Sequence, residues 1–278
     1  MKNKLGLVVL VVMVSAAVLL VCQQPAGRGP IPPQTTEPAT TPSPTASDRA
    51  FTYAGLPRSS LPLKILKNRG FIAGYSEARH NPLWVAYRVF KAESPTTHKR
   101  PSRFKGDDRT DVKVTHDDYT RSDYDRGHMA PNYAIATRYG RDAQLETFLM
   151  SNICPQKAAL NQHVWKELEM LVAKEYANRL EEVWIVCGPI FDEQIEKLAS
   201  GVEIPDAFYK IIVDEKDGKV RALAFVMPQE ASSIEKDELA TFLTSVDEIE
   251  RRTKLDFLHE LPDGTESALE AVAADVLW

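Results

Sequence analysis

Residues 23–50 determine which part of this chain can form a globular fold. The segment is dense in proline, threonine, serine and alanine, and its apolar residues follow no helical or strand period. Such a composition cannot bury enough apolar surface to offset the conformational entropy lost on ordering. The sequence therefore predicts a disordered Pro/Thr/Ser-rich linker at 23–50 that acts as an extended tether. Residues 51–278 are left to form the fold, and their number suits one domain with a sizeable core.

Residues 1–22 have the pattern of a targeting or anchoring segment. Lys2 and Lys4 precede a largely apolar run over residues 5–22. That run approaches the roughly 20 apolar residues needed to span a bilayer, but a basic start and an apolar core also describe a secretory signal peptide. Leu19-Leu20-Val21-Cys22 loosely resembles a lipoprotein lipobox, with a poor match at Val21. A cleaved signal peptide and an N-terminal membrane anchor, retained or lipidated, are both open alternatives.

The apolar patterning of residues 51–278 predicts a mixed fold. Strands are predicted over residues 83–90, 145–153, 182–187, 207–213 and 220–227, the last two flanking a hairpin turn. Helical periodicity predicts an amphipathic helix over 161–180 and a polar helix over 245–252. Because strands and helices do not strictly alternate, we expect an α+β fold with a central, mostly antiparallel sheet flanked by helices.

The charge of the chain excludes one class of protein. The formal net charge is −5, and non-specific coating of nucleic acid depends mainly on neutralising phosphates with basic residues. A strongly basic DNA-coating protein is therefore excluded. Lysines and arginines do gather over residues 99–126, but aspartates sit among them. On charge alone this segment is better described as a solvated loop of mixed charge than as a basic cleft.

Cys154 and Cys187 each follow an apolar segment and are candidates for neighbours in the fold. A disulfide would require an oxidising compartment. Two buried free thiols are the favoured interpretation, and the absence of a CxxC pair argues against structural zinc.

The segment Asp125-Arg126-Gly127-His128 has the residue types of a phosphodiester-cleaving site. Histidine is the side chain whose ordinary pKa lets it accept or donate a proton near neutrality. Arginine can hold a phosphate with two parallel hydrogen bonds. We expect Gly127 to allow a backbone bend that presents His128 and Arg126 at a cleft, followed by an extended or turning exit at Met129-Ala130-Pro131. A lone histidine is more often a hydrogen-bonded structural residue, so this motif needs support from elsewhere in the chain.

The predicted helix over 161–180 supplies that support. Asn161, Trp165 and Glu169 recur every four residues and so lie along nearly one face. The amide oxygen of Asn161 suits a hard cation such as Mg²⁺, which proteins often hold by one or two oxygens. Glu169 suits hydrogen bonding to the water shell of that ion. Helix N-capping by Asn161 and a salt bridge from Glu169 are the structural alternatives.

Together these segments resemble the DNA/RNA non-specific endonuclease family, which belongs to the ββα-metal, or His-Me finger, group. The resemblance rests on Asp125-Arg126-Gly127-His128, on Asn152-Ile-Cys-Pro-Gln156, and on Leu160-Asn161-Gln162 followed by Trp165 and Leu168-Glu169. It covers about residues 53–269. It implies a ββα-metal nuclease fold for 51–278 and a Mg²⁺-dependent, largely sequence-nonspecific endonuclease acting on DNA and RNA, with Mn²⁺ as a substitute ion and products carrying 5′-phosphates.

The resemblance also implies roles for single residues. His128 matches the general base and Asn161 the direct Mg²⁺ ligand, while Arg126 and Glu169 match residues that support the phosphate and the water shell of the metal. The family uses a further arginine upstream of an aromatic-Lys-x-Asp stretch, here Phe104-Lys105-Gly106-Asp107. Either Arg100 or Arg103 could serve, and we favour Arg103.

Other functions and settings stay open at this point. The main alternatives are a non-catalytic, surface-tethered nucleic-acid-binding domain, a related phosphodiesterase acting on small nucleotides, and an adhesion ectodomain on a stalk. A homodimer is an open possibility for the assembly. The N-terminal segment predicts an extracytoplasmic domain, either secreted, periplasmic or membrane-anchored, or located in the mitochondrial intermembrane space if the source is eukaryotic.

Overall fold

The computed structural model describes residues 50–278 except for 94, 97, 193 and 233–235. The predicted signal peptide or anchor at 1–22, and the predicted linker at 23–50 except for Ala50, lie outside the described residues. Within the described residues, no helix has both the length and the apolar character that crossing a membrane requires.

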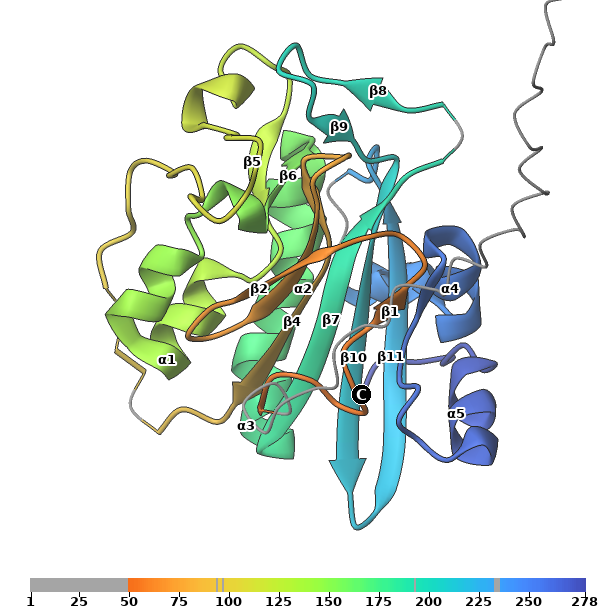
Figure 1. The fold of residues 1–278 in the computed structure, drawn as a ribbon. Helices are drawn as coiled ribbons and strands as arrows, with labels where there is room; N and C mark the ends of the chain where they lie inside the picture. Colours follow the sequence, from red (N-terminus) through yellow and green to blue (C-terminus); the bar gives the residue numbers. More distant parts are fainter. Residues whose placement is uncertain (1–49, 94, 97, 193, 233–235) are drawn as a thin grey trace, which may run out of the picture. The chain divides into compact units, whose positions relative to one another are not determined.

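A seven-stranded sheet forms the centre of the fold, and every neighbouring pair of its strands is antiparallel (Figure 1). The order across the sheet is β12 (Leu243–Thr244), β11 (Lys219–Pro228), β10 (Ala207–Lys216), β7 (Glu182–Ile190), β4 (Asn81–Phe90), β3 (Ile72–Ser76) and β2 (Lys64–Lys67). Three short antiparallel pairs lie outside it: β1 (Arg58–Ser59) with β13 (Leu255–Asp256), β8 (Glu196–Lys197) with β9 (Glu203–Ile204), and β5 (Asp125–His128) with β6 (Ile153–Gln156).

Both faces of the sheet are buried, so its central strands are apolar on both sides. In β10, Phe208 and Ile212 belong to one core, whereas Tyr209, Ile211 and Val213 belong to the core on the other face. This division follows from the alternation of side chains along a strand. The sheet therefore separates the domain into two packed layers.

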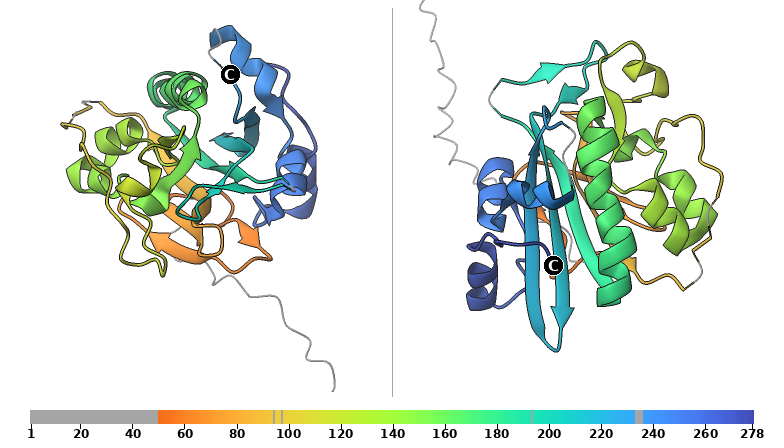
Figure 2. Two further views of the ribbon diagram at one scale, coloured as in Figure 1. Left: turned by 90° about the horizontal axis from the view of Figure 1, so that it is seen from above. Right: turned by 180° about the vertical axis from the view of Figure 1, so that it is seen from behind.

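The helices are distributed over the two faces (Figure 2). One face is covered by α1 (Asn132–Glu146) and by a long helix in four parts: a π-helical turn (Leu160–Val164), α2 (Trp165–Leu171), a second π-helical turn (Val172–Tyr176) and α3 (Ala177–Leu180). The other face is covered by α4 (Val246–Thr253), with further packing from the α5 (Asp263–Glu270) region. Three 3₁₀ segments complete the described elements: His116–Tyr119, Met150–Asn152 and Lys236–Phe242.

Most of the predicted elements are present, including the α+β class, the antiparallel sheet, the long helix and the hairpin formed by β10 and β11. The predicted strand over 145–153 is wrong. Residues 145–146 end α1, a 3₁₀ turn follows, and only Ile153 enters a strand. Leu145 is 41% exposed, so its apolar character does not mark a buried strand, and a short apolar run cannot by itself be told from a helix end.

Helix α1 itself was missing from the sequence prediction. It begins directly after Pro131, whose extended backbone (φ −76°, ψ 135°) confirms the predicted exit from His128. Gly140 interrupts the helix with φ 82°, a backbone conformation that glycine adopts readily. That interruption breaks the 3.6-residue apolar period on which helix prediction depends.

Candidate active site

Strands β5 and β6 and the long helix form one compact ββα unit on the α1 face of the sheet. Gly127 pairs with Cys154 across the two strands. It has the extended conformation of a strand residue, so the predicted bend at Gly127 is wrong. The glycine is needed for space instead, because a Cβ atom there would lie 1.9 Å from Oε1 of the buried Gln156.

His128 ends β5 and is 7% exposed. Its ring lies between two aromatic side chains, with ring centroids 5.2 Å from Phe104 and 4.9 Å from Phe148. Burial, with a contribution from the positive charge of Arg100, lowers the pKa of His128 to about 3. Its Nε2 atom has no hydrogen-bond partner among the described residues. The imidazole is therefore neutral near pH 7, with a ring nitrogen free of protein partners.

Asn152 fixes the backbone beside His128, a role that the sequence did not reveal. Its side-chain oxygen accepts a hydrogen bond from the Ala130 N–H at 2.9 Å, and its amide nitrogen donates to the carbonyls of Ala130 and Thr147 at 3.0 Å each. Asn152 is fully buried, as is Cys154 two residues later. Cys154 and Cys187 are both buried free thiols, which confirms the favoured prediction.

Asn161 lies in the first π-helical turn and does not cap the helix. Its amide nitrogen donates to Oδ2 of Asp125 at 2.9 Å, and the neighbouring Gln162 donates to the same oxygen at 2.8 Å. The capping alternative is therefore wrong. Since Nδ2 is held by Asp125, Oδ1 of Asn161 is left as the atom available to a cation.

Trp165 joins the helix to the strand of His128. It is buried, and its indole N–H donates to the His128 carbonyl at 3.3 Å. On its other side, the ammonium of Lys210 lies 3.9 Å from the centroid of the Trp165 ring. Lys210 is 0% exposed and its Nζ has no hydrogen-bond partner among the described residues. The cation–π contact partly replaces the solvation that this buried charge has lost.

Glu169 lies two helical turns beyond Asn161, with its Oε1 buried and without a hydrogen-bond partner in the described part of the chain. Burial raises the pKa of Glu169 to about 7, against the opposing effects of Lys210, Trp165 and Arg100. The salt-bridge alternative is not observed, since no Lys, Arg or His nitrogen of the described residues lies within 4.0 Å of its carboxylate.

Arg126 uses two of its guanidinium nitrogens in hydrogen bonds with the neighbouring loop. Its Nε donates to the His116 carbonyl at 3.0 Å, and Nη2 donates to the same carbonyl and to the Thr120 hydroxyl. Its Nη1 makes no hydrogen bond within the described part of the chain. Because Arg126 and His128 are two residues apart in β5, their side chains point to the same side of the strand.

The two upstream arginines, Arg100 and Arg103, lie in different surroundings. The guanidinium of Arg100 lies 5.2 Å from the centroid of the Phe148 ring, which contacts His128, and its charge affects both His128 and Glu169. Arg103 is exposed and forms an ion pair with the exposed Asp117 at 2.9 Å. Arg100 rather than Arg103 therefore belongs to the cluster around His128.

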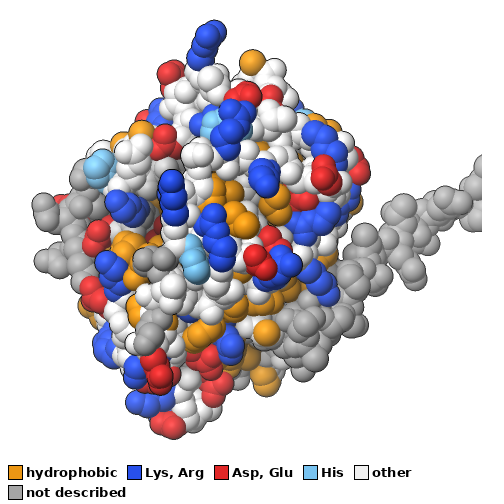
Figure 3. Space-filling model, turned by 90° about the vertical axis from the view of Figure 1, so that its left-hand side faces the viewer, with side chains coloured by type: hydrophobic (Ala, Val, Ile, Leu, Met, Phe, Trp, Pro, Cys, Tyr) orange, Lys and Arg blue, Asp and Glu red, His pale blue; other side chains and the backbone are white. Residues whose placement is uncertain are grey.

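The side chains in the cluster fit a hard divalent cation. Asn161 offers an amide oxygen, and Glu169 offers a buried carboxylate oxygen without a partner. Oxygen ligands of this kind suit Mg²⁺ rather than softer metals. In the space-filling view of this side of the molecule, lysine and arginine side chains surround small hydrophobic patches (Figure 3).

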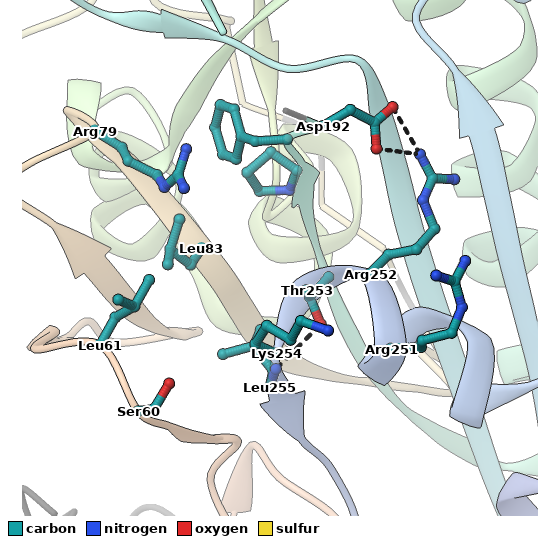
Figure 4. A pocket seen from close by; sticks show the side chains of 12 residues that line it. Ser60, Leu61, Arg79, Leu83, Asp192, Arg251, Arg252, Thr253, Lys254 and Leu255 are labelled. Atoms are coloured by element: carbon teal, nitrogen blue, oxygen red, sulfur yellow. Dashed lines mark hydrogen bonds and ion pairs between the residues drawn. The ribbon is translucent and has the colours of Figure 1, made fainter. Parts of the chain in front are cut away.

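A pocket of about 620 Å³ lies elsewhere, between the ends of β4 and β7 and the end of α4 (Figure 4). None of the predicted site residues lines it. Its three arginines are already paired with carboxylates: Arg79 with Glu203, Arg251 with Glu248 and Arg252 with Asp192. The pocket is therefore not part of the His128 cluster.

A family model described as DNA/RNA non-specific endonuclease matches residues 50–264. The chain belongs to the DNA/RNA non-specific endonuclease family. The resemblance inferred from the two motifs is thus confirmed, and the expectation of an enzyme is confirmed at the level of this family of hydrolytic endonucleases.

Several proteins similar to this chain have names that call them mitochondrial. The chain is 31% identical over 224 residues to the mitochondrial nuclease EXOG of Danio rerio, covering 74% of this chain and 64% of that protein. It is 30% identical over 233 residues to the mitochondrial nuclease of Saccharomyces cerevisiae, covering 75% and 70%. Human endonuclease G is 28% identical over 219 residues, with 69% of each chain covered.

A solved structure supports the fold of the family. The chain resembles endonuclease G in the crystal structure of the EndoG/EndoGI complex, with a TM-score of 0.65 and 25% identity, over 80% of this chain and 95% of that one. This likeness confirms the predicted ββα-metal nuclease fold.

Proposed function

We propose that this chain is a Mg²⁺-dependent, largely sequence-nonspecific endonuclease that hydrolyses phosphodiester bonds of DNA and RNA. The observation that carries the proposal is the shared ββα unit, which holds a neutral His128 beside a helix where Asp125 orients the amide of Asn161. A general base and an oxygen ligand for a hard cation are what such hydrolysis requires.

His128 acts as the general base that takes a proton from water. Its low pKa keeps the ring neutral and ready to accept that proton over the neutral pH range. A phosphate bound beside the ring raises this pKa, because a negative charge stabilises the imidazolium form. The side chains of Asn152 and Trp165 form hydrogen bonds with the backbone of Ala130 and His128, and these bonds fix the segment that carries the ring.

Asn161 would hold Mg²⁺ through Oδ1, and Glu169 would accept hydrogen bonds from the water shell of the ion. When bound, Mg²⁺ supplies positive charge that stabilises the pentacoordinate phosphorus and the departing 3′ oxygen. We expect Mn²⁺ to substitute, because it prefers the same oxygen ligands. Products with 5′-phosphates follow from departure of the 3′ oxygen.

Arg100 and Arg126 are the candidates for phosphate contact. Arg126 lies on the same side of β5 as His128, and its Nη1 has no hydrogen-bond partner among the described residues, while Arg100 is exposed beside Phe148. Contacts to phosphate and sugar carry no base information. This is the basis for proposing low sequence specificity and activity on both DNA and RNA.

Plasmid digestion with and without Mg²⁺ tests the proposal directly. The wild-type chain should nick and linearise plasmid DNA in Mg²⁺ or Mn²⁺ and fail to do so in EDTA. His128→Ala should lower the rate by at least about 10²-fold, which is the smaller end of what a general base contributes. Near-normal cleavage by a folded His128→Ala variant would overturn the assignment.

The same assay separates the alternative functions. A non-catalytic nucleic-acid-binding domain would retard plasmid in a gel without cutting it. A phosphodiesterase for small nucleotides would hydrolyse a small chromogenic phosphodiester faster than plasmid or RNA. Competition among these three substrates decides between the alternatives.

The setting of the enzyme also remains a proposal. The mitochondrial names of the relatives favour the mitochondrial option over a secreted or periplasmic one. The intact mass of the mature protein would distinguish a cleaved, lipidated or retained N-terminal segment. Light scattering in solution would test the predicted homodimer.

A further inference from the structure

Three carboxylates meet where α4 packs against α5, on the sheet face opposite His128. Asp247 and Glu250 lie three residues apart on α4, and so on one side of that helix, while Glu270 is the last residue of α5. One carboxylate oxygen from each residue lies within 4.8 Å of the other two. Asp247 is exposed, Glu250 is partly buried and Glu270 is only 5% exposed. The cluster therefore leads from solvent to a buried carboxylate at its floor.

The negative charge of this cluster is not balanced by an ion pair within the part of the chain that the structure describes. Within the described residues, no lysine or arginine forms an ion pair with any of the three carboxylates, and Oε1 of Glu270 is buried without a hydrogen-bond partner. Two further acidic residues lie nearby, Glu266 and Asp256, of which Asp256 forms an ion pair with Arg58. Burial of an unpaired carboxylate is strongly unfavourable.

The position of Glu270 in its helix adds to this cost. The C-terminal end of an α-helix carries a partial negative charge from its free carbonyl groups, which favours cations there and disfavours carboxylates. Burial together with the neighbouring carboxylates raises the pKa of Glu270 to about 8. The arrangement is unfavourable for three bare carboxylates and favourable for a bound positive charge.

Glu250 is already held in position for such a charge. Its Oε1 accepts a hydrogen bond from the Phe257 N–H at 2.7 Å, which fixes the carboxylate to the segment between α4 and α5. One of its two carboxylate oxygens lies within 4.8 Å of oxygens of Asp247 and Glu270. The three side chains thus come together from two helices, and an ion bound by all three would fix the position of α4 relative to α5.

We propose that Asp247, Glu250 and Glu270 bind a Ca²⁺ ion that ties α4 to α5. Ca²⁺ takes oxygen ligands at about 2.3–2.6 Å, so two of its ligands can lie up to about 5 Å apart. Mg²⁺ requires about 2.0–2.1 Å and near-ideal octahedral geometry. The three oxygens lie within 4.8 Å of one another, inside the span that Ca²⁺ allows, and the flexible coordination of Ca²⁺ suits carboxylates held on two separate helices. The site is structural and separate from the proposed catalytic site.

Thermal unfolding of the full chain tests the proposal. After treatment with EDTA, addition of Ca²⁺ to about 100 times its Kd should raise Tm by about 5–10 °C. The same concentration of Mg²⁺ should raise it less. Asp247→Asn, at an exposed position where the fold should tolerate the change, and Glu270→Gln should each reduce or abolish the Ca²⁺ shift. Glu248→Gln is the matched control, because Glu248 lies on the same helix but pairs with Arg251.

Calorimetric titration with Ca²⁺ complements the melting data. The wild-type chain should bind one Ca²⁺ that is lost in the triple variant Asp247→Asn, Glu250→Gln, Glu270→Gln. The Asn161→Ala variant should keep both this Ca²⁺ and the Tm shift, whether or not the proposed catalytic function is correct. Absence of a Ca²⁺ shift in the wild type, its retention in the triple variant, or its loss in Asn161→Ala would each overturn the proposal.

Discussion

The side-chain amide of Asn161 donates a hydrogen bond to Asp125, with 2.9 Å between Nδ2 and Oδ2. Asp125 begins β5 and Asn161 lies in the first π-helical turn, so the bond joins the strand of His128 to the long helix. It also determines which atom of the Asn161 amide faces away from Asp125. Asp125, which had no role in the sequence motif, thereby becomes a positioning residue for the proposed metal ligand.

Removal of the Asp125 acceptor should therefore weaken the metal site without unfolding the domain. For Asp125→Ala we expect the apparent Mg²⁺ affinity to fall by about 10–100-fold, as for other residues that orient metal ligands. Asp125→Asn should recover part of the loss, because its amide oxygen can still accept one bond. The measurement is plasmid cleavage as a function of Mg²⁺ concentration. Gln162→Ala, which removes only the second bond to Asp125, should stay near wild type; equal losses in both variants would refute the positioning role.

Arg100 and Arg103 should differ in their effect on catalysis. Arg100 lies against Phe148 and influences both His128 and Glu169, so Arg100→Ala should lower the cleavage rate by about 10-fold or more through lost charge stabilisation. Arg103→Ala breaks only an exposed ion pair with Asp117, an interaction worth little. Its rate should stay within about 3-fold of wild type in the same steady-state assay. The opposite order would restore Arg103 as the phosphate contact.

Gly127→Ala should destabilise the domain through a single steric conflict. The added Cβ would lie 1.9 Å from Oε1 of Gln156, whose side chain is fully buried. Overpacking of this kind costs about 1–3 kcal/mol. Urea unfolding measures the loss, and the double variant Gly127→Ala, Gln156→Ala should regain part of it. If the two changes were simply additive, the proposed contact would not be the cause.

His128 should make the domain sensitive to mild acid. Its pKa is about 3 in the folded protein and near 6.5 when unfolded. Between these values the unfolded chain binds the extra proton, so stability is lost as pH falls below 6.5. Relative to His128→Ala, the wild type should lose about 2 kcal/mol of unfolding free energy between pH 7 and pH 5.

Urea unfolding at the two pH values gives this difference. The His163→Ala variant, which changes an exposed histidine on the long helix, serves as the control. It should lose as much unfolding free energy between pH 7 and pH 5 as the wild type does. A parallel response of wild type and His128→Ala would show that the buried ring is not the source of the acid sensitivity.

The sequence predicted those features that depend on local pattern. The long helix, the β10–β11 hairpin and the ββα resemblance follow from periodicity, a turn sequence and two spaced motifs. Helix α1 was missed because Gly140 breaks its period. The sequence favoured Arg103, whereas the structure brings Arg100 near His128, because loop spacing does not determine which side chain reaches that histidine. The role of Asp125 depends on a contact over 36 positions of sequence, which no local pattern contains.

The central sheet has a practical consequence for work on this protein. The His128 cluster lies on one face of the sheet, whereas α4 and the α5 region pack against the other face (Figure 2). A fluorophore or affinity handle attached to the exposed surface of α5 would therefore sit behind a layer of packed strands. Such a reporter would follow folding or immobilise the enzyme while leaving the His128 side of the sheet open to the proposed polymeric substrate.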